Sequence, residues 1–343
     1  MSRFVLGIDI GGTGSRAALG AIDADGGLSG AGRNDSGPAP IVTPLTRPRV
    51  VDTFTGPRIE VGAGGSTVLA VARELVDSAA RTWSRQLPDI VGIGIGATGI
   101  ASLSEDPADA LTEIFAELGI PAVVAIDAVT AHLGALGGRG GAITVLGTGA
   151  IAIAHPGPDE RGRWAADWSR VDGWGHLFGD RGGGAWLGRL GLETALRTHD
   201  GLDEHGRTLL EAGTRRFGPP ASWPGQFYTR NNRAGLLAEF AADIAACARS
   251  GDIASAELLD EAGREAARSA VAAGRAASPR IALTGGVAAA GGRLVEGFRA
   301  EASRLQPDVA VVDPAGGPLD GALTLAHLGA GGKLSAQDKV IWS

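Results

Sequence analysis

Two kinds of hydrophobic pattern alternate along most of the chain. Continuous apolar runs predict strand–turn–strand hairpins over 4–22 and 142–152, and single strands over 89–95, 121–126, 280–283 and 309–312. Apolar positions three or four residues apart predict helices over 66–85, 107–118, 128–136, 185–198, 234–249, 253–276, 292–305 and 318–328. Between them, 33–65 predicts loops with one or two strands, and we expect the tail 329–343 to be loosely ordered in part. Strands that alternate with helices are typical of the α/β class.

The two predicted hairpins share an unusual turn. The first turns through Gly11-Gly12-Thr13 and the second through Gly147-Thr148-Gly149. Glycine lets the backbone approach a phosphate closely, and free N–H groups in such a turn can donate to phosphate oxygens. Two such turns predict an ATP-binding protein, with these phosphate ligands: Gly11, Gly12, Thr13, Ser15, Gly147, Thr148 and Gly149.

A third glycine pair, Gly285-Gly286, follows the strand 280–283, where a nucleobase or ribose can lie against exposed backbone. The chain carries neither the Walker phosphate loop nor the Rossmann fingerprint, so these two nucleotide-binding folds are not predicted.

Two aspartates follow predicted buried strands. Asp9 ends the first strand just before the glycine turn, where its carboxylate could hold Mg²⁺ directly or through water, or serve as an ordinary turn residue. Asp127 follows the strand 121–126 and precedes a helix, which places it at the carboxyl edge of a sheet, where ligands bind in α/β folds. The alternative for Asp127 is a helix N-cap.

Residues 164–188 combine four of the seven tryptophans with Asp167, Asp172 and Asp180 and many glycines. Carboxylates bind sugar hydroxyls and aromatic rings stack on sugar rings, so the stretch predicts a sugar site; a structural tryptophan cluster is the alternative. His176 could act as a general base, but a lone histidine among six scattered ones is more often structural.

Composition narrows the class of protein. With 343 residues the chain can form two domains, and a net charge of −7 argues against a nucleic-acid or anionic membrane partner. The apolar runs are too short for a membrane helix, and the first strand begins too early to leave room for a signal peptide. The single cysteine, Cys247, excludes an intrachain disulfide and suits a reducing, cytoplasmic location.

Taken together, the motifs resemble those of the acetate kinase, sugar kinase, Hsp70 and actin superfamily of ATPases. The glycine turns at Gly11-Gly12 and Gly147-Thr148-Gly149 match its two phosphate motifs, and Gly285-Gly286 matches its adenosine motif. Segments 94–99 and 318–322 match its two connecting segments. The resemblance implies a two-domain actin-like (ribonuclease H-like) α/β fold with a central interdomain cleft. It also implies a small domain formed by 1–126 and about 318–343, and a large domain formed by 127–317.

Within the superfamily, the chain resembles the BadF/BcrA-type group that includes N-acetylglucosamine kinase. The resemblance rests on 126–128, 146–149 and the run from Gly173-Trp174-Gly175-His176 to Gly182. It implies that Asp127 is the catalytic base and that the sugar is bound by Ser66, Thr98, Asp127, Gly173, Trp174, Gly175 and Asp180. The stretch 179–183, which reads Gly-Asp-Arg-Gly-Gly where those kinases usually read Gly-Asp-Glu-Gly-Ser, is similar to actinobacterial glucosamine kinases. One cysteine can supply neither the zinc site of ROK-type kinases nor the shared iron–sulfur cluster of dehydratase activators.

The expected function is transfer of a phosphoryl group from Mg²⁺-ATP to the 6-hydroxyl of D-glucosamine. Asp167 and Asp172 would add acidic groups beside Asp180 for the charged amine. The first alternative is an N-acetylglucosamine kinase of the same fold, and a more distant one is a nucleotide-switched ATPase with no sugar substrate. By analogy with relatives, we expect a homodimer.

Overall fold

The computed structural model describes residues 3–12, 14–22, 47–62, 65–100 and 118–342. It divides into two compact units. The first unit consists of Met1–Gly140, His155–Trp168 and Pro314–Ser343, and the second of Gly141–Ala154 and Ser169–Asp313. The predicted helix over 107–118 falls almost entirely outside the described residues.

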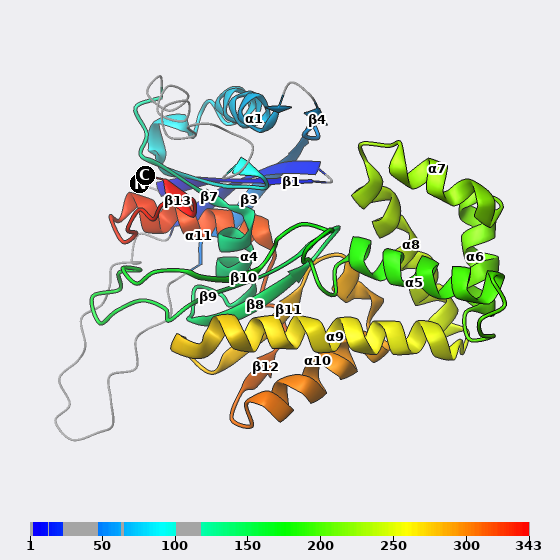
Figure 1. The fold of residues 1–343 in the computed structure, drawn as a ribbon. Helices are drawn as coiled ribbons and strands as arrows, with labels where there is room; N and C mark the ends of the chain where they lie inside the picture. Colours follow the sequence, from blue (N-terminus) through cyan, green and yellow to red (C-terminus); the bar gives the residue numbers. More distant parts are fainter. Residues whose placement is uncertain (1–2, 13, 23–46, 63–64, 101–117, 343) are drawn as a thin grey trace. The chain divides into compact units, whose positions relative to one another are not determined.

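A six-stranded mixed sheet forms the centre of the first unit, in the order β13-β7-β6-β1-β2-β3. Its strands are β1 (Arg3–Gly11), β2 (Gly14–Ile22), β3 (Arg49–Gly56), β6 (Ile90–Ala97), β7 (Ala122–Ile126) and β13 (Ile341–Trp342). Strands β1, β6 and β7 are parallel neighbours, so their carboxyl ends meet at one edge of the sheet. Helix α1 (Val68–Thr82) covers one face, and α4 (Asp127–Ala135) and α11 (Pro318–Ala330) cover the other (Figure 1). A short hairpin, β4 (Val61–Gly62) and β5 (Gly65–Ser66), and a 3₁₀ turn, η1 (Leu87–Asp89), complete the described elements of this unit.

The second unit contains a five-stranded sheet in the order β10-β9-β8-β11-β12. Its strands are β8 (Gly141–Leu146), β9 (Ala150–His155), β10 (Ser169–Asp172), β11 (Arg280–Thr284) and β12 (Ala310–Val312). The helices are α5 (Gly184–His199), α6 (Arg207–Phe217), α7 (Trp223–Tyr228), α8 (Arg233–Arg249), α9 (Ile253–Ala273) and α10 (Gly292–Leu305), with 3₁₀ turns η2 (Pro220–Ser222), η3 (Gly274–Ala276) and η4 (Val287–Ala290) (Figure 1). The core between them combines many alanines with a few large side chains, among them Trp223, Phe240 and Phe298.

Most predicted elements are confirmed within a few residues, but the short strand β10 and the helices α6 and α7 were not predicted. Helix α6 buries only Leu209, Ala212 and Gly213, so its apolar stripe is too narrow to stand out from the sequence. Helix α7 is six residues long and buries Trp223 alone. Both pack at the edge of a core that the longer α5 and α8 already cover.

The structural alternative is confirmed for two of the clustered tryptophans. Trp164 and Trp168 are buried in the first unit and stack on each other, with ring centroids 5.7 Å apart. His132 and His155 pack edge-on or tilted against the same pair. The His155 Nδ1 accepts the Gly157 N–H and Nε2 donates to the Ala166 carbonyl, so the ring is neutral; burial lowers its pKa to about 4.

The expectation of a loosely ordered tail is wrong at its end. Ile341 and Trp342 form β13, which pairs antiparallel with β7. The side-chain oxygen of Gln337 accepts the main-chain N–H of Trp168. The main-chain N–H of Trp164 donates to the Lys333 carbonyl at 2.7 Å. The tail is ordered because it supplies backbone partners to an edge strand and to the tryptophan cluster.

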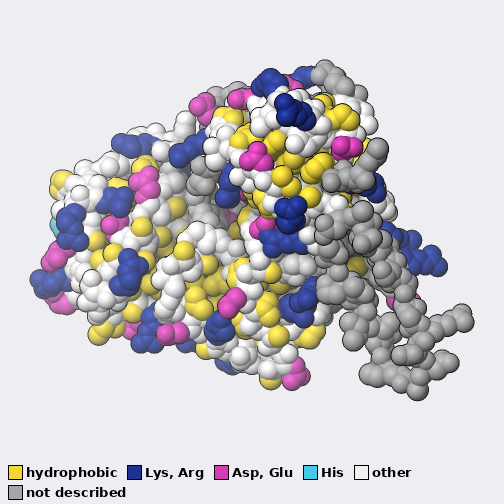
Figure 2. All heavy atoms as spheres, turned by 180° about the vertical axis from the view of Figure 1, so that it is seen from behind, with side chains coloured by type: hydrophobic (Ala, Val, Ile, Leu, Met, Phe, Trp, Pro, Cys, Tyr) yellow, Lys and Arg dark blue, Asp and Glu magenta, His cyan; other side chains and the backbone are white. Residues whose placement is uncertain are grey.

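Charges of both signs are interspersed over the face that Figure 2 presents, as expected from 31 basic against 38 acidic residues. Among the described residues, no helix combines the length and the apolar character needed to cross a membrane.

Candidate functional site

Three of the predicted site residues meet at the carboxyl edge of the first unit's parallel strands. Asp9 lies opposite Gly96 in the β1–β6 register, and Ala97 lies opposite Ile126 in the β6–β7 register, so Thr98 and Asp127 directly follow paired strand ends. The Thr98 N–H donates to the Ile10 carbonyl at 2.9 Å. The Thr98 hydroxyl hydrogen-bonds with the Asp127 carboxylate.

Asp9 is a buried carboxylate at this edge, with 6% of its surface exposed. Its pKa is raised mainly by burial and further by the charge of Asp127; the guanidinium of Arg16, at 3.3 Å, opposes the rise. Sequence reasoning missed Arg16, although its position opposite Asp9 in the β1–β2 hairpin could have been read from the register.

Asp127 is half-buried at the first position of α4. Ile126 occupies the N-cap position, so Asp127 is not the N-cap residue, although its carboxylate accepts the Ala128 N–H within the first turn. Burial raises the pKa of Asp127, while hydrogen bonds from Thr98 and from the Ala128 N–H lower it. A raised pKa makes this carboxylate a stronger base than an ordinary exposed aspartate.

Removing the Thr98 hydroxyl should move the acid limb of activity. The Thr98→Val variant loses the hydrogen bond that favours the charged form of Asp127, so the pKa of Asp127 rises further. If ionised Asp127 is the active form, both enzymes lose kcat/KM as the pH is lowered. The loss should begin at a higher pH in the variant than in the wild type. A pH profile of kcat/KM between pH 4.5 and 8 measures the shift.

Thr130→Val is the matched control, because the Thr130 hydroxyl donates to the main-chain carbonyl of Asp127 rather than to its carboxylate. Its acid limb should stay in place. Coincident profiles for wild type and Thr98→Val would contradict the role of Asp127 as base.

The first glycine turn is present, but not all of its predicted ligands converge. Gly11 pairs with Gly14, and a Cβ on Gly12 would meet open space. Thr13 lies outside the described residues. The Ser15 hydroxyl is buried and donates to the Pro57 carbonyl at 2.6 Å, so it is occupied within the fold.

Ser66 is likewise engaged locally. Its hydroxyl oxygen accepts the Val68 N–H at 3.3 Å at the start of α1.

The second glycine turn is tied to the start of α5. The first N–H groups of this helix, from Gly184 and Ala185, donate to the carbonyls of Gly147 and Thr148 at 2.8 and 2.9 Å. These two N–H groups and that of Gly147, which donates to the Gly149 carbonyl at 2.9 Å, are engaged within the fold. The N–H groups of Thr148 and Gly149 are left to face an anion, and the dipole of α5 favours negative charge beside them. The turn therefore remains a candidate phosphate site.

The predicted sugar aspartate, Asp180, is held inside a loop of the second unit. Its carboxylate accepts the N–H of Gly175 at 3.0 Å and the N–H of Ala150. Burial and the charge of Asp172 raise its pKa. Asp180 has a φ of 55°, in the left-handed region that non-glycine residues rarely adopt, so the surrounding bonds hold a strained residue in place.

Asp172 has a different role from the one expected. Its two carboxylate oxygens accept the N–H groups of Asp180 and Arg181 at 2.8 and 2.9 Å. Asp172 is buried and thus anchors the Asp180 loop rather than offering a free acidic group. Asp167, the other aspartate expected to help, is exposed and lies in the first unit.

Two further side chains of the loop are placed for contact with a ligand. Trp174 is 69% exposed, and the Arg170 guanidinium lies over its ring at 5.4 Å. The Nε2 of His176 is buried without a hydrogen-bond partner among the described residues. A buried, unpartnered nitrogen is costly unless a ligand or water satisfies it.

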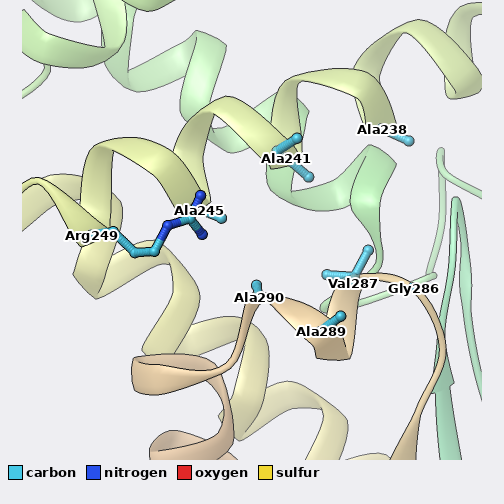
Figure 3. Close-up of a pocket in the computed structure, with 9 residues that line it drawn as sticks. Ala238, Ala241, Ala245, Arg249, Gly286, Val287, Ala289 and Ala290 are labelled. Carbon is cyan, nitrogen blue, oxygen red and sulfur yellow. The ribbon is translucent and has the colours of Figure 1, made fainter.

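The third glycine pair opens into a pocket. Gly285 has a φ of 100°, and its Cβ would lie 2.3 Å from the Leu146 carbonyl, so only glycine fits there. Beyond Gly286, a cavity of about 380 Å³ lies between α8 and η4. Figure 3 shows small side chains on both walls and Arg249 reaching along α8 beside Ala245. A slot lined mainly by small apolar side chains suits a nucleobase.

Filling this slot should weaken nucleotide binding selectively. Ala242 lines the cavity and is exposed, so Ala242→Trp can be accommodated by the fold while it obstructs the slot. We expect KM for ATP to rise about tenfold or more, a loss of about 1.4 kcal/mol in binding. Ala246→Trp, one turn along on the same helix and outside the cavity lining, is the control. Equal ATP KM values for the two variants would contradict a base site here.

No three His, Cys, Asp or Glu side chains converge as a metal site in the part of the chain that the structure describes. Mg²⁺ bound to a nucleotide does not require such a cluster, because one or two carboxylates usually suffice beside phosphates and water. Asp9 fits this requirement because it is buried and the like charge of Asp127 raises its pKa. A bound cation would stabilise the ionised form of both carboxylates.

Solved structures establish the fold. A protein from Chromobacterium violaceum, provisionally described as an N-acetylglucosamine kinase, matches with a TM-score of 0.63 and 24% identity over 94% of this chain and 98% of that chain. A ROK family glucokinase from Streptomyces griseus, solved with glucose and AMPPNP, matches with a TM-score of 0.53 and 20% identity over 94% of this chain and 99% of that chain. The expected α/β fold of the actin-like ATPases is thereby confirmed.

Sequence comparison points the same way. An N-acetylmuramic acid/N-acetylglucosamine kinase of Clostridium acetobutylicum is 29% identical over 222 residues, which cover 63% of this chain and 69% of that protein. A family model matches residues 6–299, a span that includes both glycine hairpins, Asp127, the Asp180 loop and the Gly285-Gly286 slot. The chain belongs to the BadF/BadG/BcrA/BcrD ATPase family.

Proposed function

We propose that this chain is an ATP-dependent sugar kinase that phosphorylates the 6-hydroxyl of glucosamine. The observation that carries the proposal is Asp127, a half-buried carboxylate at the carboxyl edge of three parallel strands, with a raised pKa and a hydroxyl partner in Thr98. The family membership and the sugar kinases among the similar proteins support the same class of reaction.

In this mechanism Asp127 accepts the proton of the attacking sugar hydroxyl. Phosphoryl transfer depends mainly on positioning and charge neutralisation, so a carboxylate is a sufficient base. The hydrogen bond from Thr98 favours the charged form of the carboxylate, which is the form that accepts the proton.

The nucleotide would be held by backbone groups rather than by charged side chains. In the second unit, the turn would donate the N–H groups of Thr148 and Gly149 to phosphate oxygens, since the Gly147 N–H already donates to the Gly149 carbonyl, and the slot beyond Gly286 would hold the base. In the first unit, Asp9 would hold Mg²⁺, which neutralises charge on the phosphates when bound.

The choice of an amino sugar rests on the Asp180 loop. Asp180 is a carboxylate whose pKa is raised by burial and by the neighbouring charge of Asp172. An ammonium group would relieve that repulsion, whereas a neutral hydroxyl would do so less. The unpartnered His176 nitrogen offers a further polar contact for the sugar.

N-acetylglucosamine is the second candidate substrate. The relative from Clostridium acetobutylicum is named for N-acetylated sugars, and the exposed ring of Trp174 could pack against an acetyl methyl group. Asp172, being engaged by backbone N–H groups, does not by itself favour the free amine.

Sugar-dependent release of ADP decides between these substrates. Glucosamine, N-acetylglucosamine, glucose and mannosamine are compared at equal concentration, and ³¹P–¹H correlation NMR locates the phosphate on the product. We expect the highest kcat/KM with glucosamine and a 6-phosphate product. A higher value with N-acetylglucosamine would select the second candidate, and slow ATP hydrolysis that no sugar stimulates would favour a nucleotide-switched ATPase instead.

A further inference from the structure

One contact in the second unit joins the predicted phosphate turn to the predicted sugar loop. A Cβ built on Gly149 would lie 2.3 Å from Oδ2 and 2.9 Å from Cγ of Asp180. The Asp180 carboxylate therefore occupies the space that any other residue at 149 would fill. Gly149 does not have a positive φ, so its backbone conformation does not itself require glycine.

The surrounding hydrogen bonds fix this contact from both sides. Ala150, the next residue after the turn, donates its N–H to the Asp180 carboxylate. The Asp180 carbonyl accepts the Gly183 N–H at 3.0 Å, immediately before the helix start that binds the carbonyls of the turn. A Cβ on Gly183 would in turn lie 2.5 Å from the Gly149 carbonyl carbon.

The Asp180 side chain is also oriented from its own loop. Asp172 accepts the N–H of Asp180, and Gly175 donates to Oδ1 of Asp180. With the loop bonds on one side and Gly149 on the other, the carboxylate has little freedom to move unless the turn moves too.

We propose that Gly149 is a positioning residue for Asp180, so that the phosphate turn sets the affinity for the sugar before any nucleotide is bound. This inference rests on the proposed function, in which Asp180 contacts the sugar. Sugar and phosphate binding would share one close contact between Gly149 and Asp180, so a side chain at position 149 would be felt at the sugar.

The test compares the same substitution at the two glycines of one turn. Gly149→Ala places a methyl group against the Asp180 carboxylate, whereas a Cβ on Gly147 has no atom within 4 Å. Binding of glucosamine and of N-acetylglucosamine is measured by calorimetry without nucleotide, and binding of ADP is measured separately. Circular dichroism confirms that each variant is folded.

We expect Gly149→Ala to raise the sugar Kd about tenfold or more, as for loss of a hydrogen bond to a charged group. Gly147→Ala should leave the sugar Kd at the wild-type value. Equal sugar Kd values for Gly149→Ala and wild type would overturn the inference while the proposed function stood. A wild-type protein that binds neither sugar would overturn the proposed function and the inference with it.

A double-variant cycle keeps the test decisive if Gly149→Ala folds poorly. Asp180→Ala removes the carboxylate that the new methyl group would meet, so adding Gly149→Ala to it should cost no further thermal stability. A Tm loss from Gly149→Ala that is equally large with and without the Asp180 carboxylate would overturn the contact.

Discussion

Replacing Asp127 by asparagine should lower kcat by about 10²- to 10⁴-fold, the usual contribution of a general base. Asparagine keeps the shape and the oxygen that partners Thr98, but it cannot accept the proton of the attacking hydroxyl. ADP binding, measured by calorimetry, should be close to that of the wild type, since the phosphate turn and the base slot are untouched.

The same substitution should make the protein more stable near neutral pH. Burial raises the pKa of Asp127 above its unfolded value, and its charge also raises the pKa of Asp9. A carboxyl group of this kind favours the fold while protonated, and this contribution is lost as the pH rises through the raised pKa. At pH 7.5 the asparagine variant avoids that loss, so its Tm should exceed that of the wild type, and the difference should shrink as the pH is lowered.

Asp52→Asn is the control, with the opposite sign. The Asp52 carboxylate accepts the indole N–H of Trp83 at 2.9 Å and has a lowered pKa, so its charge favours the fold above the unfolded pKa. Asp52→Asn should leave kcat unchanged and lower the Tm slightly at pH 7.5.

An Asp127→Asn enzyme that kept most of its kcat would show that Asp127 is not the base.

The sequence carried enough information to place the residues of the strand edge. A buried parallel strand is a continuous apolar run, so a polar residue at or near its carboxyl end is visible, as with Asp127 directly after β7 and Asp9 within β1. The expectation that Asp9 ends its strand is wrong, because β1 continues to Gly11. The glycine turns were visible for the same reason, because each interrupts an apolar hairpin. The order of the strands was not visible, yet it decides that Thr98 lies between the two carboxylates.

Side-chain roles that depend on distant partners could not be predicted. The Ser15 hydroxyl is taken up by Pro57, 42 residues away, and Trp168 is held by Gln337, 169 residues away. Asp172 looked like a free acid in the sequence, but its oxygens bind the backbone of a loop eight and nine residues further on. Composition marked residues 164–188 as unusual, but it could not show that Trp164 and Trp168 are buried while Trp174 is exposed.

Gly321 belongs to the segment 318–322, which the sequence matched to a connecting motif, and in the fold it serves helix packing. Its substitution gives the largest expected effect on stability. It lies in α11, and a Cβ there would be 1.7 Å from the Thr130 carbonyl oxygen and 2.8 Å from the Gly134 nitrogen, both in the backbone of α4. Neither atom can move without separating the two helices. Gly321→Ala should therefore destabilise the first unit by about 3 kcal/mol or more, at the upper end of overpacking costs.

The same substitution should have the opposite effect at Gly235 in α8. A Cβ there would meet no atom within 4 Å, so Gly235→Ala gains helix propensity without a clash and should stabilise the protein by roughly 0.5–1 kcal/mol. Urea titration of both variants measures the two values against wild type. If Gly321→Ala were as stable as Gly235→Ala, the close approach of α11 to α4 would be wrong, and with it the packing behind the strand ends that carry Asp9 and Asp127.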